Sequence, residues 1–208
     1  MAFLPGFFPP GAAGGRLPAA LSYIGPIQND NTAQTTYTFA AVPFGATNTG
    51  PRRVVIAFHW SITNAARTVV SATIGGIAAT IDVQATTGPT VAQLDMGCAI
   101  LSALVPTGTS GTVTVTLSAA AARAACNSWR LINENSPTPF STTTDITLTG
   151  NVLNGAINIP LTGALVGAAN LAIGAGATNA WAGVTENYDA PHTGAAGVLQ
   201  TGGGDTGL

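Results

Sequence analysis

The sequence predicts an all-β protein with a single β-sandwich or jelly-roll body, and three observations support this prediction. Apolar and polar residues alternate along several stretches, as they do in strands that bury one face. Paired glycines or Asn-Gly separate some of these stretches and favour tight hairpins. No stretch keeps the 3.6-residue period of an amphipathic helix. We therefore expect a sandwich over residues 20–190, an extended N-terminal arm over 1–19 and a Gly-rich C-terminal tail over 191–208.

The clearest strand is RVVIAFHWSI, at residues 53–62. One of its faces carries the alternating residues Val54, Ile56, Phe58, Trp60 and Ile62. His59 and Ser61 point the other way, so this strand is expected to be half buried. Because apolar residues flank His59, we interpret it as structural rather than catalytic.

The stretch VSATIGGIAATIDV, at residues 70–83, predicts a β-hairpin. Apolar residues alternate on both sides of Gly75 and Gly76, and two glycines accept the positive φ angles of a two-residue hairpin turn. Asn154 and Gly155 form a second dipeptide of this kind. They predict another hairpin within residues 144–162.

Further strands are expected at residues 37–42, 91–104, 109–118, 123–133, 164–173 and 179–185. In the stretch TSGTVTVTLS, at residues 109–118, the valines and the leucine are expected to point inward and the alternating threonines outward. The stretch AAAARAA, at residues 119–125, could form a helical turn because alanine favours helix. Its position after an amphipathic strand favours a turn into the next strand instead.

The chain carries little charge. Charged residues make up 7% of it, against about 25% in ordinary soluble domains. It has no lysine, and its six basic and eight acidic residues leave a net charge of −2. Such a surface gives little repulsion between copies, which favours packing into an assembly.

The low content of basic residues also argues against several classes of binding partner. No basic patch is present to neutralise phosphates, so nucleic-acid binding is not expected. No Lys/Arg cluster supports binding to an anionic membrane. The longest apolar run, at residues 163–177, is too short and too rich in glycine to span a bilayer.

Two cysteines, Cys98 and Cys126, are too few for a disulfide framework or a zinc site. In VAQLDMGCAI, Cys98 shares a strand face with Leu94, Met96 and Ile100. We expect a buried thiol that behaves as a small hydrophobe. A disulfide between Cys98 and Cys126 stays open, because sequence spacing does not fix the geometry.

The opening segment MAFLPGFFPPG differs from the rest of the chain. It has neither the charged start nor the uninterrupted apolar stretch of a signal peptide, and its three prolines prevent a helix. Its large apolar side chains are expected to dock on a partner and bury their surface there; they are Phe3, Leu4, Phe7 and Phe8. The alternative is that the arm packs against its own domain.

Two polar stretches are candidate ligand sites. In TENYDAPHT, Glu186, Tyr188, Asp189 and His192 lie close together. Two carboxylates and an imidazole could bind a divalent cation, although a polar surface loop is the favoured interpretation. The stretch QNDNT, at residues 28–32, could be a weak calcium loop, but a turn fits its composition better.

No catalytic motif stands out. The chain has no GxSxG nucleophile elbow, and its scattered carboxylates suggest no glycosidase pair. The glycines of GAGATNAWAG do not open a helix after a strand, so they do not form a dinucleotide loop. We therefore expect no enzymatic activity, no cofactor and no metal.

Five segments give the sequence a resemblance to a known class of proteins: FLPGFFPPG, RRVVIAFHW, SATIGGIAAT, TSGTVTVTLS and NAWAGVTENYDA. With these segments the chain resembles the virion proteins of tailed bacteriophages, in particular small jelly-roll modules of head decorations, spikes, collars and tail fibres. The resemblance implies a multimeric, non-enzymatic building block located in the virion. Its partners would be further copies of itself and other virion subunits.

A carbohydrate-binding or adhesin module is the alternative function. In that case Trp181, Tyr188 and Asp189 would contact a host-surface glycan from loops. Sugar binding needs an exposed aromatic platform beside polar groups. Because Trp60 and Trp129 alternate as core residues do, few aromatics remain for such a platform, and the structural function is favoured.

Overall fold

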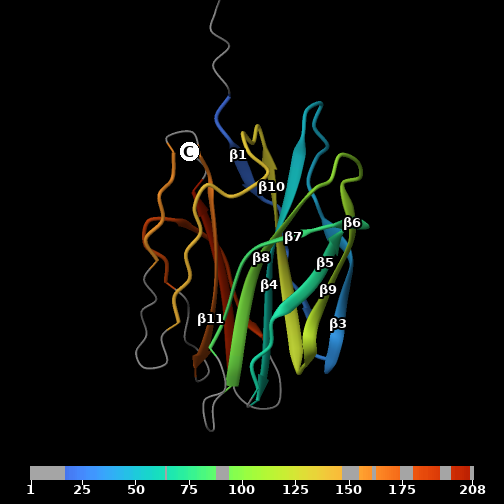
Figure 1. Cartoon of the computed structure of the whole chain (residues 1–208), viewed down its shortest axis with the longest axis vertical. Coiled ribbons are helices and arrows are strands. Elements are labelled where there is room, and N and C mark those ends of the chain that lie inside the picture. The colour runs from blue at the N-terminus through green and yellow to red at the C-terminus, as the bar shows by residue number, and fades with distance from the viewer. Residues whose placement is uncertain are drawn as a thin grey trace, which may run out of the picture.

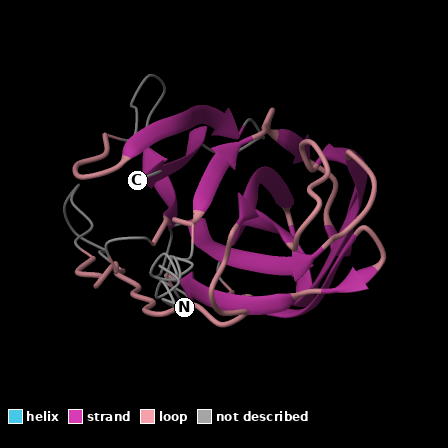
Figure 2. Cartoon of the chain, turned by 90° about the horizontal axis from the view of Figure 1, so that it is seen from above, coloured by secondary structure: helices cyan, strands magenta, loops and turns pink. Residues whose placement is uncertain are grey.

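The computed structural model describes residues 17–63, 65–87, 94–146, 155–160, 163–173, 180–192 and 198–206. Within these ranges the chain forms strands and loops but no helix, and all strand pairs are antiparallel. Seen from above in Figure 2, the strands stack in layers. The expected all-β sandwich is confirmed, because two antiparallel sheets pack against each other.

The strands of the described residues form three sheets. The central sheet contains β1 (Ala20–Tyr23), β2 (Gln28–Asp30), β4 (Arg52–Thr63), β7 (Thr80–Thr86), β8 (Leu94–Leu104) and β10 (Arg123–Ile132). The threonine sheet contains β3 (Gln34–Pro43), β5 (Val69–Ile74), β6 (Ile77–Ala78) and β9 (Ser110–Ala121). The C-terminal sheet contains β11 (Leu165–Ile173), β12 (Thr185–His192) and β13 (Val198–Thr206). In Figure 1 β11 lies on the left, β4, β8 and β10 in the middle, and β3, β5 and β9 on the right.

The main core lies between the central sheet and the threonine sheet. Its large side chains are aromatic and fully or almost fully buried: Tyr37, Phe39, Phe44, Phe58 and Trp60. The period-two pattern of β3 and β4 directs Tyr37, Phe39, Phe58 and Trp60 into one layer, where they meet the aliphatic side chains of β9. This burial of apolar surface is the main force that holds the two sheets together.

The prediction that β4 is half buried is wrong, because both of its faces are covered. Val55 and Ala57 lie on the face opposite Phe58 and form a second apolar cluster with Trp129. The C-terminal sheet covers this cluster through residues such as Val166. Strands covered on both sides tend to be continuously apolar, and the run VVIAF at the centre of β4 fits that rule.

The hairpin at Gly75 and Gly76 is confirmed, with φ angles of 60° and 79°. Its second strand, however, ends at Ala78. The chain then crosses to the central sheet, where β7 pairs with β8. Alternation alone did not distinguish one long hairpin strand from two strands in different sheets.

Three other boundaries differ from the sequence predictions. The last predicted strand, at residues 179–185, is displaced, because β12 begins only at Thr185. Asn154 lies outside the described residues, and residues 155–160 are not in a strand. The expected tail at 191–208 contains the end of β12 and all of β13. Pairing with β11 on one side and β12 on the other outweighs the weak strand preference of the glycines in β13.

Candidate functional site

The docking residues expected from the sequence are Phe3, Leu4, Phe7 and Phe8, and all four lie outside the described residues. Within the described part of the chain, two other features stand out. One is a cluster of polar and aromatic side chains between the central and C-terminal sheets, which we call the interlayer cluster: Tyr23, His59, Asn127, Trp129, Asn170, Asn187 and Tyr188. The other is a groove at one end of the threonine sheet.

His59 is the centre of the interlayer cluster. It lies on β4, is fully buried, and both ring nitrogens reach the C-terminal sheet. Nδ1 lies 2.7 Å from Oδ1 of Asn170, and Nε2 lies 2.7 Å from the hydroxyl of Tyr188. The expectation that His59 faces away from the main core is confirmed, but a third layer covers it.

The hydrogen bonds of Asn170 determine which group donates in its contact with His59. Its Nδ2 donates to the carbonyl of Gly97, so its Oδ1 faces His59 and can only accept. Nδ1 of His59 therefore carries a proton, and whenever the ring is neutral, Nε2 accepts from the Tyr188 hydroxyl. The imidazole thus joins two strands of the C-terminal sheet to the central sheet.

Tyr188 lies on β12, so the expectation of a loop at Glu186–His192 is wrong. A bulge between Glu186 and Tyr188 shifts the register and allows Tyr188 to point inward. Its ring lies 5.9 Å from the rings of both Tyr23 and Trp129. Burial raises the pKa of Tyr188 well above its usual value, an effect only partly offset by the amide of Asn127.

The remaining bonds of the cluster also connect strands. The indole of Trp129 donates to Oδ1 of Asn187 over 2.9 Å, and the hydroxyl of Tyr23 donates to Oδ1 of Asn127 over 2.9 Å. Polar groups that leave water need such partners. The cluster therefore supplies directional contacts between two layers whose apolar contact is small.

The two cysteines are free and lie on opposite faces of the central sheet. Cys98 is opposite His59 in the strand register and donates to the carbonyl of Ala168 over 3.5 Å. Cys126 is opposite Phe58 and belongs to the main core. The possible disulfide between them is therefore not formed. Burial raises the pKa of Cys98 to about 11 and that of Cys126 further.

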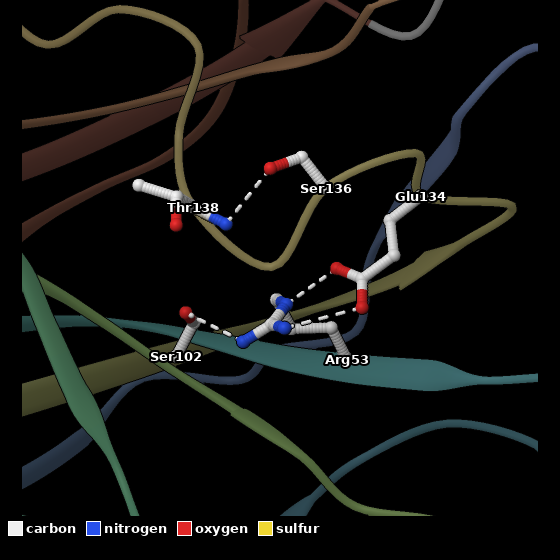
Figure 3. A network of polar contacts seen from close by, with 5 residues as sticks. All are labelled: Arg53, Ser102, Glu134, Ser136 and Thr138. Carbon is white, nitrogen blue, oxygen red and sulfur yellow. Dashed lines mark hydrogen bonds and ion pairs between the residues drawn. The ribbon is translucent and has the colours of Figure 1, made fainter.

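A second polar group lies at the other end of the central sheet (Figure 3). The guanidinium of Arg53 pairs with the carboxylate of Glu134 over 2.5 and 3.1 Å and donates to Oγ of Ser102 over 3.2 Å. Burial raises the pKa of nearby Asp82, while the bond from Ser102 and the charge of Arg53 lower it. This group attaches the loop after β10 to the central sheet.

The side chains of the two candidate cation stretches are described only in part. Asp30 accepts from the backbone N–H of Thr32 and from the amide of Gln34, as expected of a turn. Glu186 is exposed, and the side chain of His192 lies outside the description. Among the described residues, no three His, Cys, Asp or Glu side chains are grouped so that they could hold a metal ion. The described part also has no helix long and apolar enough to cross a membrane.

The threonine sheet presents an unusual outer face. None of its four strands contains a charged residue. Its outward hydroxyl side chains are Thr36 and Thr38 of β3, Ser71 and Thr73 of β5, and Thr112, Thr114 and Thr116 of β9, and the exposed Val70 lies on β5 as well. They form rows across the sheet, and the hydroxyls of Thr36 and Thr116 lie 3.1 Å apart. The outward threonines of β9 were predicted from alternation, whereas the rows depend on register.

The groove has a volume of about 480 Å³ and lies where the turn at Gly75 and Gly76 meets the loop between β8 and β9. Phe44, Ile77 and Val105 are its apolar lining residues. Sequence reasoning missed it, although glycines recur in the segments that line it.

Comparison of the chain with protein-family models, curated proteins and solved structures finds no match. The proposals below therefore rest on the geometry and the sequence of this chain.

Proposed function

We propose that this protein is a non-enzymatic structural subunit of a symmetric particle, of the kind found in the virions of tailed bacteriophages. Its N-terminal arm attaches it to neighbouring subunits. The observation that carries the proposal is the threonine sheet, four strands without one charged residue and with an outer face of hydroxyl groups. The phage context comes from the sequence resemblance.

An uncharged sheet face suits contact between identical copies. Surfaces of soluble domains usually contain about 25–35% charged residues, which keep copies apart and are costly to bury. Threonine offers a methyl group for packing and a hydroxyl that both donates and accepts. Rows such as Thr38, Thr114 and Thr73 can therefore meet a second such face without burying a charge.

The interlayer cluster supports a structural function as well. His59 is the side chain best suited to acid–base chemistry at neutral pH, yet both of its nitrogens are engaged in bonds between layers. Tyr188, which was considered for sugar binding, packs between Tyr23 and Trp129. The geometry thus favours assembly over the carbohydrate-binding alternative.

The test compares the full chain with the triple variant Phe3→Ser, Phe7→Ser and Phe8→Ser. The variant removes most of the apolar surface of the arm, so the assembled species seen by size-exclusion chromatography with light scattering should be replaced by monomer. The melting temperature should stay unchanged. Phe140→Ser is the matched control, because Phe140 is 71% exposed on a loop of the body. Equal assembly of the triple variant and the control would contradict the proposal.

A further inference from the structure

The C-terminal sheet is held to the central sheet by side-chain contacts. Within the described residues, none of its strands pairs with a strand of the central sheet. The apolar part of the contact is small, because only Val166, Ala168 and Tyr188 of its described residues pack on the second apolar cluster. The main core is much larger. Loss of the polar contacts would therefore release this layer before the main sandwich opens.

The polar contacts on both sides of the His59 ring have a fixed order of donors and acceptors. The amide of Asn170 donates to the carbonyl of Gly97 over 2.5 Å and presents its Oδ1 to Nδ1 of His59. On the other side of the ring, the hydroxyl of Tyr188 makes its described hydrogen bond to Nε2. A neutral ring thus satisfies polar groups on β11, β4 and β12 together.

A second proton on the ring would break this order. Nε2 would then donate to the Tyr188 hydroxyl, and the proton of that hydroxyl would lose its acceptor. The amide of Asn127 stabilises the ionised form of Tyr188, so it acts there as a donor and not as an acceptor. His59 is fully buried, and both a lost hydrogen bond and a new charge are costly in such a place.

The other titratable groups on the same face do not favour a positive charge. They are Cys98 of β8, Arg123 of β10 and Tyr188 of β12. Arg123 is opposite Ser61, two positions along β4 from His59, and it is itself a cation. A thiol and a phenol whose pKa values are raised by burial remain neutral. β11 contains no titratable residue.

The carboxylates of the surrounding strands occupy other positions. By alternation, Asp30 and Asp95 lie on the main-core face of the central sheet. Glu186 and Asp189 alternate with the inward Tyr188 across the bulge and lie on the outer face of the C-terminal sheet. Asp205 is opposite Val166, toward the end of β13 away from the partner of Asn170. Register thus places these carboxylates away from the position of His59.

We propose that protonation of His59 switches the C-terminal sheet from an attached to a released layer, while the main sandwich stays folded. This release does not depend on the N-terminal arm or on assembly. In the released state the imidazole is in water, where a histidine has a pKa of about 6.5. Because the released state binds more protons, release becomes more favourable as the pH falls. For one proton, its equilibrium constant should rise about thirtyfold from pH 7.5 to pH 5.

The two cysteines report release and unfolding separately. The thiol of Cys98 lies against the C-terminal sheet, where it donates to the carbonyl of Ala168, whereas Cys126 belongs to the main core. The full-length protein is treated with a dipyridyl disulfide, whose leaving thiol has a low pKa, so that exchange proceeds at acid pH as well. Mass spectrometry identifies the labelled peptides, and each rate is divided by the rate of the unfolded chain at the same pH.

This rate ratio should rise about thirtyfold for Cys98 from pH 7.5 to pH 5 and stay constant for Cys126. Aspartate and glutamate remain mostly ionised over this interval, so their titration contributes little. A constant ratio for Cys98 would contradict the proposal. A parallel rise for Cys126 would show global unfolding instead of release of one layer, and would overturn it as well.

Two variants assign the proton. His59→Gln keeps a side chain that donates and accepts but does not titrate, so its Cys98 ratio should be the same at both pH values. His192→Gln is the matched control, because the chain has two histidines, and it should keep the thirtyfold rise. A rise that persists in His59→Gln, or one that disappears in His192→Gln, would assign the proton to another group.

Hydrogen exchange of the unaltered protein tests the release without a substitution. After correction for the chemical exchange rate at each pH, exchange in β11 and β12 should quicken between pH 7.5 and pH 5, while exchange in β9 stays constant. Unchanged protection of β11 and β12 would show that the layer stays attached. An equal loss of protection in β9 would show that the whole molecule opens. Either result would overturn the proposal.

Discussion

The hydroxyl of Tyr188 lies 2.7 Å from Nε2 of His59, and this contact joins the C-terminal sheet to the central strand β4. Both groups are removed from bulk water, and a hydrogen bond of this kind fixes the orientation of each. The two residues are separated by 129 positions in the sequence. The contact therefore forms only when the third layer is in place.

The first prediction concerns this contact. Tyr188→Phe removes the donor to His59 but keeps the ring that packs on Trp129, so it should lower the free energy of unfolding by about 1–3 kcal/mol. Hydrogen exchange should quicken in β11 and β12 more than in β9. Thr38→Val, a substitution of an exposed residue on β3, is the control. Unchanged exchange in β11 and β12 would show that the contact does not hold the sheet.

The second prediction concerns Gly97, which lies under the indole of Trp60. A Cβ atom on Gly97 would come within 2.1 Å of the Trp60 ring, and that ring is almost fully buried. Gly97→Ala should therefore cost about 1–3 kcal/mol of stability through overpacking, measured by chemical denaturation. Gly50→Ala is the matched control, because its Cβ would meet only ordinary contact at 3.5 Å. Equal stabilities of the two variants would refute this packing.

The third prediction is an alkaline transition. Burial raises the pKa of all three tyrosines, with Tyr37 at about 12. A phenol whose pKa is higher in the folded state stabilises the fold fully below its unfolded pKa of 10.0. This stabilisation is lost as the pH rises toward the folded value. Stability should therefore fall between about pH 10 and 12, and tyrosinate absorbance should appear together with unfolding. Formation of tyrosinate at pH 10 in the folded protein would contradict the burial of the three tyrosines.

The fourth prediction concerns the cysteines. Both thiols are free, and burial raises the pKa of Cys98 to about 11, so little reactive thiolate is present at neutral pH. Neither thiol should react with a thiol reagent in the native protein, and both should react after unfolding in denaturant without reductant. A count of zero thiols in the unfolded, unreduced protein would reveal a disulfide.

Local patterns were enough to predict much of the sandwich. The alternation in β4 and β9 identified both strands and most of the residues that these two strands contribute to the main core. Gly75 and Gly76 identified the turn, because few other residues accept two successive positive φ angles.

The interlayer cluster and the groove were not predictable in this way. The cluster depends on a third sheet whose middle strand, β13, is rich in glycine and lacks alternation. It also depends on the bulge before Tyr188, which turns that side chain inward. The groove combines a turn and loops that are distant in sequence. Both features depend on contacts between segments that are distant in the sequence, and a single sequence does not reveal such contacts.

The central claim is that this chain is built to pack against copies of itself through its N-terminal arm and its uncharged sheet. Sedimentation velocity of the untagged full-length protein, over a range of concentrations, tests it most directly. The account predicts one discrete species with a mass several times that of a single chain, which persists on dilution. A single-chain mass at every concentration would contradict it.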